Sequence, residues 1–229
     1  TMPIPKLLLT MSGPMMISMF IQALYNVVDS MFVSYISEAA LTAVSLAYPM
    51  QNLMIAVATG TGVGVNALLS RNLGEKNYSM ANRVAGNAIF LGLVSYVVFA
   101  LLGLLGSRFY FSVQVEDPNI IALGHDYLSI VTILSVGCFG QVLLSRLLQS
   151  TGKTFYSMVI QMVGAGLNLV LDPIMIFGLL GFPKMGVAGA ALATVISQLA
   201  GTALGVYYNL RKNPEIQFSL STLRPSKPV

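Results

Sequence analysis

Charged residues are scarce in this sequence. Asp, Glu, Lys and Arg together make up 9% of the 229 residues, whereas they make up about 25% of an ordinary soluble domain. Apolar residues account for 55% of the chain, and the mean hydropathy is +0.78. This composition excludes an ordinary soluble domain and predicts a protein that lies in a lipid bilayer.

Cysteine and histidine occur once each. Cys138 lies inside an apolar run, so one chain can form neither a disulfide framework nor a thiolate metal site. His125 has no second histidine with which to build an imidazole metal site. We therefore expect Cys138 to be a small buried apolar residue, and we expect no resident metal apart from a sodium ion of the kind that drives transport.

Motifs for binding nucleotides or nucleic acids are lacking as well. Residues 60–64 are rich in glycine, but they lie in an apolar run and no Gly-Lys-Ser/Thr follows them. The twelve Lys and Arg residues are spread thinly over turns and ends, without a basic stripe. We therefore expect no nucleic-acid partner, no organic cofactor and no enzymatic activity, and the energy for any transport must come from an ion gradient.

Long apolar runs are abundant, and they define the fold class. About 20 apolar residues are needed for one helical crossing of a bilayer, and lipid leaves the backbone polar groups no partners outside a helix. The sequence predicts an all-α integral membrane protein with six spans, near residues 10–35, 41–69, 81–106, 120–146, 155–180 and 187–210. Residues 1–212 would form this six-helix lobe.

Basic residues are unequally divided between the alternate turns. Arg108 and Lys184 fall on one side of the predicted bundle. Ten fall on the other side: Lys6, Arg71, Lys76, Arg83, Arg146, Lys153, Arg211, Lys212, Arg224 and Lys227. The side richer in Lys and Arg is cytoplasmic in multi-pass proteins, so we expect both termini in the cytoplasm. Residues 213–229, with three prolines among the last 16, are predicted to be a cytoplasmic linker or tail.

Two aspartates lie well inside predicted spans. A carboxylate at the middle of a bilayer costs about 2.5–3.5 kcal/mol on insertion scales, so Asp29 and Asp172 are expected to face the interior of the bundle and a partner. Burial favours the neutral, protonated form. An acid poised between its two forms can load and release a proton or a sodium ion, although a structural, hydrogen-bonded role is the alternative for each aspartate.

Other polar residues share helical faces with these acids. Residues three, four and seven apart lie on one face of a helix. The first span carries Gln22, Tyr25, Asn26 and Asp29; the fifth carries Gln161, Asn168 and Asp172; the sixth carries Thr194 and Gln198. If these three stripes converge, they enclose a polar chamber for a cation and a substrate. Pro14, Pro49 and Pro173 would bend their helices and are candidate hinges.

Five stretches resemble the MATE (multidrug and toxic compound extrusion) family. They are QALYNVVD at 22–29, GTGVGVNALLSRNLGEKN at 60–77, QSTGK at 149–153, NLVLDP at 168–173 and PKMGVAGAALAT at 183–194. The family has twelve helices in two lobes, and this chain resembles the first lobe of the prokaryotic branch whose cation site lies in that lobe. The resemblance implies that Asp29, Asn168, Asp172 and Thr194 bind the coupling proton or sodium ion. It also implies that Gln22, Tyr25 and Asn26 line the substrate cavity, and Gln161 and Gln198 would lie beside them.

The resemblance implies a proton- or sodium-coupled antiporter of the cell membrane that exports amphipathic or cationic drugs by alternating access. Its partners would be the drug, the bilayer and a second six-helix lobe, from the same parent chain or, less favoured, from a homodimer. Two alternatives remain. One is a flippase for lipid-linked saccharides, whose cavity would contain several inward-facing basic residues. The other is a lobe fragment or an assembly subunit that does not transport.

Overall fold

The computed structural model describes residues 4–216, and their side chains from Leu8 onward. Seven α-helices and one short 3-10 helix follow one another in these residues. They are α1 (Ile4–Ser34), α2 (Glu38–Gly74), α3 (Tyr78–Ser112), α4 (Pro118–Ile133), α5 (Val136–Ser150), α6 (Thr154–Phe177), η1 (Leu179–Gly181) and α7 (Val187–Lys212). The predicted all-α fold class is confirmed.

Five of the helices are long and apolar enough to cross a membrane singly, namely α1, α2, α3, α6 and α7. The remaining predicted span, near 120–146, differs from the prediction of one helix. It is broken into α4 and α5, which meet at an angle of 45°. No proline stands at this break, but Ser135 lies in it and Gly137 follows in the first turn of α5, and Gly/Ser pairs are a common cause of a sharp bend. Counted as one bent span, the pair brings the crossings to six.

Local capping explains where several helices begin. The side chain of Ser37 accepts a hydrogen bond from the backbone nitrogen of Ala40, and Asn77 does the same for Met80. The side chain of Asp117 caps α4 by accepting a hydrogen bond from the backbone nitrogen of Asn119. Pro118 follows in the first turn, where no backbone donor is needed. At the far end of α6, Gly178 takes a left-handed φ of 74° and turns the chain away.

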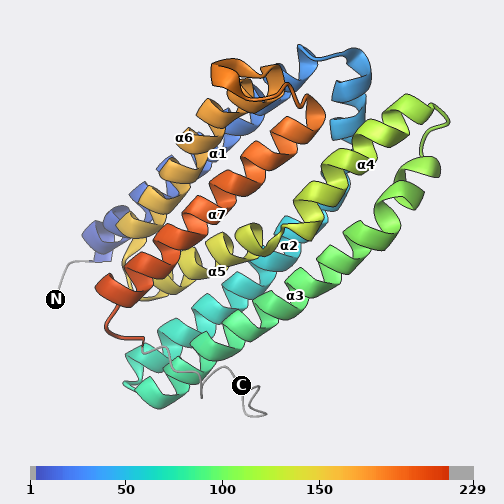
Figure 1. The fold of residues 1–229 in the computed structure, drawn as a ribbon. Coiled ribbons are helices and arrows are strands. Elements are labelled where there is room, and N and C mark those ends of the chain that lie inside the picture. The colour runs from blue at the N-terminus through green and yellow to red at the C-terminus, as the bar shows by residue number, and fades with distance from the viewer. Residues whose placement is uncertain (1–3, 217–229) are drawn as a thin grey trace.

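The helices form two groups joined by α5 (Figure 1). Helices α1, α6 and α7 pack on one side, α2, α3 and α4 on the other, and α5 contacts both α2 and α7. The contact between α6 and α7 is close because Gly189 lacks a side chain: a Cβ there would lie 2.5 Å from the carbonyl oxygen of Met175. Small residues at such contacts let membrane helices approach at backbone distance.

Both ends of the described chain lie at the same end of the bundle, where α1 begins and α7 ends (Figure 1). The turns after α2 and α5 lie there too, because Ser70 donates a hydrogen bond to the carbonyl oxygen of Ser150. This is the end that the distribution of Lys and Arg predicts to be cytoplasmic. The cytoplasmic orientation itself stays a prediction.

The first residues after α7 pack against the lobe, which the prediction of a linker from Asn213 onward did not anticipate. Asn213 and Ile216 are buried. Lys153 donates to Asn213 Oδ1 at 3.1 Å and forms an ion pair with Glu215 at 2.8 Å. The lobe therefore extends at least to Ile216, and residues 217–229 of the predicted tail lie outside the described part of the chain.

Candidate functional site

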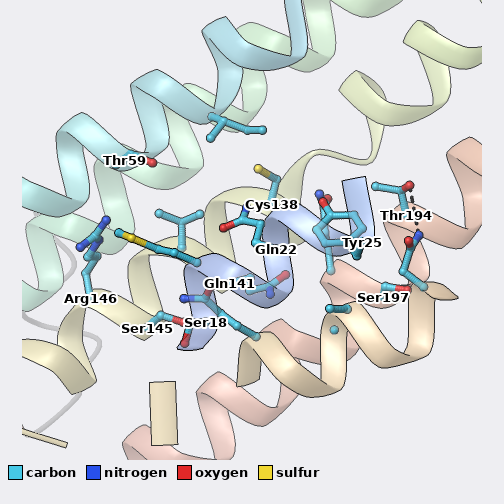
Figure 2. Close-up of a pocket in the computed structure, with 18 of the residues that line it drawn as sticks. Ser18, Gln22, Tyr25, Thr59, Cys138, Gln141, Ser145, Arg146, Thr194 and Ser197 are labelled. Carbon is cyan, nitrogen blue, oxygen red and sulfur yellow. Dashed lines mark hydrogen bonds between the residues drawn. The ribbon is translucent and has the colours of Figure 1, made fainter. Parts of the chain in front are cut away.

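A polar cavity of about 280 Å³ opens between the two groups of helices (Figure 2). Helices α1, α2, α5, α6 and α7 all contribute to its wall. The lining residues are Ser18, Met19, Gln22, Tyr25, Ile55, Thr59, Cys138, Gln141, Val142, Ser145, Arg146, Gln149, Gln161, Gly164, Ala165, Asn168, Thr194, Ser197 and Gln198. The three polar stripes expected from the sequence therefore meet at one cavity.

A small hydrogen-bonded cluster lies at one end of this cavity. Asn168 Nδ2 donates to Asp172 Oδ1 at 3.3 Å and to Thr194 Oγ1 at 3.4 Å. Thr194 donates in turn to the carbonyl oxygen of Ala190 at 3.0 Å. The three side chains of this cluster are buried, with exposed fractions of 3%, 1% and 8% for Asn168, Asp172 and Thr194. Helices α6 and α7 thus hold an amide, a carboxyl group and a hydroxyl in contact.

Asp29 completes the cluster from α1. Its half-buried side chain lies near that of Asp172. Two carboxylates at such a distance repel each other strongly when both are ionised. A bound cation, or a proton shared between the two groups, removes the repulsion.

Several oxygens of this cluster lack hydrogen-bond donors in the described protein. They are Asp29 Oδ1, Asn168 Oδ1 and Asp172 Oδ2, all of them buried. Buried polar atoms without a partner are rare in proteins, and each one calls for a water, an ion or a proton as its partner. Carboxylate, amide and hydroxyl oxygens are the ligands preferred by hard cations. Within residues 4–216 no group of three His, Cys, Asp or Glu side chains is placed to hold a metal ion.

The predicted site residues divide into three sets. Those that line the cavity are Gln22, Tyr25, Gln161, Asn168, Thr194 and Gln198. Asp29 and Asp172 are not part of its wall, but Asp172 is hydrogen-bonded to Asn168, which is. Asn26 is exposed and stands outside the wall. Its predicted role in binding substrate stays a prediction.

The three candidate hinges lie inside continuous helices. Pro14 is within α1, Pro49 within α2 and Pro173 within α6. The residue after each proline remains helical. Pro173 directly follows Asp172, so a movement of α6 at this point would displace the carboxyl cluster. Hinge motion at these positions stays a prediction.

The sequence reasoning missed one face of the cavity, which α5 supplies. Gln141, Ser145 and Gln149 are spaced four residues apart and so share one side of that helix. This spacing was visible in the sequence and could have identified the face. Arg146 was assigned to a cytoplasmic turn, yet it is half-buried and lines the cavity within the last two turns of α5.

Comparison with known proteins shows that this chain is similar to membrane transporters. The family model described as MatE matches residues 14–174. An FAD transporter of Shewanella oneidensis is 32% identical over 92% of this chain and 47% of its own length. A multidrug export protein, MepA of Staphylococcus aureus, is 26% identical over 98% of this chain and 49% of its own length.

Solved structures show the same likeness. A transporter of the MOP superfamily from Pyrococcus furiosus superposes with a TM-score of 0.90 at 29% sequence identity. The match covers 97% of this chain and 49% of the archaeal protein. The chain therefore spans about half the length of the relatives that it matches.

Proposed function

This chain belongs to the MATE family of multi-pass membrane transporters, and from that premise we propose that it forms one lobe of an ion-coupled exporter of amphipathic or cationic organic molecules. The names of its relatives point to two kinds of cargo, drugs and FAD. We assign the class of amphipathic small molecules to the site and not a single compound. The lobe resides in the cell membrane with both ends in the cytoplasm.

One observation carries the proposal. Asn168, in the cavity wall, bonds both Asp172 and Thr194, and Asp29 lies next to Asp172. The acids are thus one residue away from the cavity in which a substrate would lie. A proton or sodium ion bound at Asp29, with help from Asn168, Asp172 and Thr194, neutralises this end of the cavity and shifts α1 against α6. The shift expels the substrate toward the outside.

The second half of the cavity wall comes from another lobe. This chain covers only about half of each relative. The five helices that line the cavity here therefore leave the contribution of the other half of such a protein unaccounted for. We propose a second six-helix lobe of the same parent chain as the partner, with a homodimer as the less favoured arrangement. Measuring the mass of the purified particle in detergent separates a monomer, a homodimer and a complex with a second lobe.

A flippase for lipid-linked saccharides is the nearest rival function. Its anionic, phosphate-bearing substrate calls for several basic residues in the cavity. Arg146 is the one Lys or Arg among the described residues that line the cavity. One cation in a wall of 19 residues favours a small-molecule exporter over a flippase.

The proposal is tested by the energy source of export. Cells that express the protein with its second lobe are loaded with a fluorescent cationic drug, and efflux is followed while the proton and sodium gradients are imposed separately. Efflux is expected to stop when the driving gradient is dissipated and to continue when ATP alone is depleted. Efflux that persists after both gradients have been collapsed would contradict ion coupling.

A further inference from the structure

The position of Arg146 in the wall of the cavity is fixed by packing against α2. Its side chain crosses α2 at Gly62, where an added Cβ would lie 2.7 Å from the Cγ atom of Arg146. The absence of a side chain at Gly62 therefore provides the space through which the arginine reaches the cavity. A cation that is accommodated in this way by a second helix is held by packing and is not a freely moving surface residue.

The hydrogen bonds of Arg146 orient it but do not neutralise it. Its Nη1 donates to Gln149 Oε1 at 3.0 Å, and Gln149 Nε2 donates to Ser157 Oγ at 2.8 Å. Both ion pairs found among residues 4–216 involve other cations, Arg71 and Lys153. Guanidinium has five N–H donors, so most of those of Arg146 remain available to a ligand.

The two ends of the cavity differ in charge. Figure 2 shows Arg146 at one end and Thr194 at the other, with Gln22, Gln141 and Cys138 between them. The acidic cluster lies behind the Thr194 end. At the Arg146 end, the hydroxyl oxygen of Ser145 is buried and has no hydrogen-bond partner in the described protein. A cationic group and an unpaired hydroxyl at one end form a pocket for a negatively charged group.

We propose that the cavity also accepts amphipathic molecules that carry an anionic group, a carboxylate, sulfonate or phosphate, bound by Arg146 and the hydroxyl of Ser145. The uncharged body of the molecule lies along Met19, Ile55 and Val142, which supply the apolar part of the wall. This inference rests on the proposed function, because it takes the cavity to be the substrate site. It adds to the proposed cargo a class of amphipathic molecules that bear a negative charge.

Two fluorescent probes of nearly the same size test the charge preference. Dansylglycine ends in a carboxylate, and dansylglycinamide ends in a neutral amide. Each is titrated into the detergent-purified protein, together with any second lobe that accompanies it. Because a charge-assisted hydrogen bond contributes about twice as much as a neutral one, dansylglycine is expected to bind about tenfold more tightly. Arg146→Gln should remove this difference, and Arg146→Lys should retain part of it.

Two controls tie the preference to the cavity. Arg211 is exposed in the last turn of α7 at the same end of the bundle, so Arg211→Gln should leave the tenfold preference unchanged. Ala165 lines the cavity from α6. A phenyl ring there fills part of the cavity, so Ala165→Phe should weaken the binding of dansylglycine.

The inference is overturned if the two probes bind wild type equally, if neither binds, or if the preference survives Arg146→Gln. It is also overturned if Ala165→Phe leaves the binding of dansylglycine unchanged, because the probe then occupies another place. Equal binding together with gradient-driven drug efflux would remove this inference alone. An intact preference in a protein that shows no gradient-driven efflux would remove the transport function and leave the anion site.

Discussion

Asp29→Asn is expected to abolish uphill export while leaving the protein folded in the membrane. Asparagine has nearly the shape of aspartate but cannot take up and release a proton, and it lacks the negative charge that attracts sodium. One charge that crosses 100 mV supplies about 2.3 kcal/mol, and one pH unit supplies about 1.4 kcal/mol. Together they support a substrate ratio of roughly a hundredfold or more. In the variant the ratio should fall to about one.

The measurement is the steady-state drug ratio across vesicles with imposed pH and sodium gradients. Asp126→Asn provides a matched control, because Asp126 is exposed on α4, away from the cavity. That variant should keep the wild-type ratio. Asp172→Asn should resemble Asp29→Asn, since the two carboxyl groups lie near each other. A wild-type ratio in Asp29→Asn would show that the coupling ion binds elsewhere.

Ala165→Phe is expected to reduce efflux to the background of cells that lack the protein. Ala165 lines the cavity from α6 and is half-buried. A phenyl ring at this position projects into a space of only about 280 Å³ and competes with the substrate for it. The carboxyl cluster is not altered, so the binding of the coupling cation should persist. Cells that express the variant are assayed for drug efflux after equal loading.

Val170→Phe is the control on the same helix. Val170 is 57% exposed and lies roughly opposite Asn168 around α6, since adjacent residues of an α-helix are separated by about 100°. A ring there points away from the cavity and should leave efflux near the wild-type rate. If Ala165→Phe were as active as Val170→Phe, the substrate path would not pass through this cavity.

Much of the candidate site followed from periodicity in the sequence. Helical spacing alone placed Gln22 and Tyr25 on one face of α1, and both line the cavity. Within α6, Asn168 and Asp172 are four residues apart and are hydrogen-bonded. Polar residues are costly in lipid, so in a membrane helix most of them face the interior of the bundle. That physical constraint is the reason why the three stripes could be anticipated.

Periodicity could not reveal how the helices meet. The contact between Asn168 and Thr194 joins residues 26 positions apart, and the pairing of Asp29 with Asp172 joins the first and sixth helices of the element order. Such contacts depend on which helices are neighbours, and one sequence without tertiary information does not specify this. The role of Asn26 therefore stays a prediction. It has the correct spacing for the polar stripe, yet it is exposed and outside the cavity wall.

Arg146 is a second residue whose surroundings depend on packing between helices. Its position near the end of an apolar run made it a plausible member of a cytoplasmic turn, and the rule for basic residues counted it there. The break between α4 and α5 turns α5 by 45° across the bundle. As a result, residues near the end of α5 face the cavity. The neighbours of α5 and the space above Gly62 could not be inferred from local sequence, because both depend on packing between distant helices.

The central claim is that Asp29 and Asp172 exchange a cation with the cavity when substrate binds. The direct test is to measure the protons and sodium ions released by the purified protein, with its second lobe, on addition of a transported drug. Wild type is expected to release about one cation per lobe, and the Asp29→Asn Asp172→Asn double variant none, as the carboxyl groups that held it are gone. Equal release from the two proteins would contradict the account.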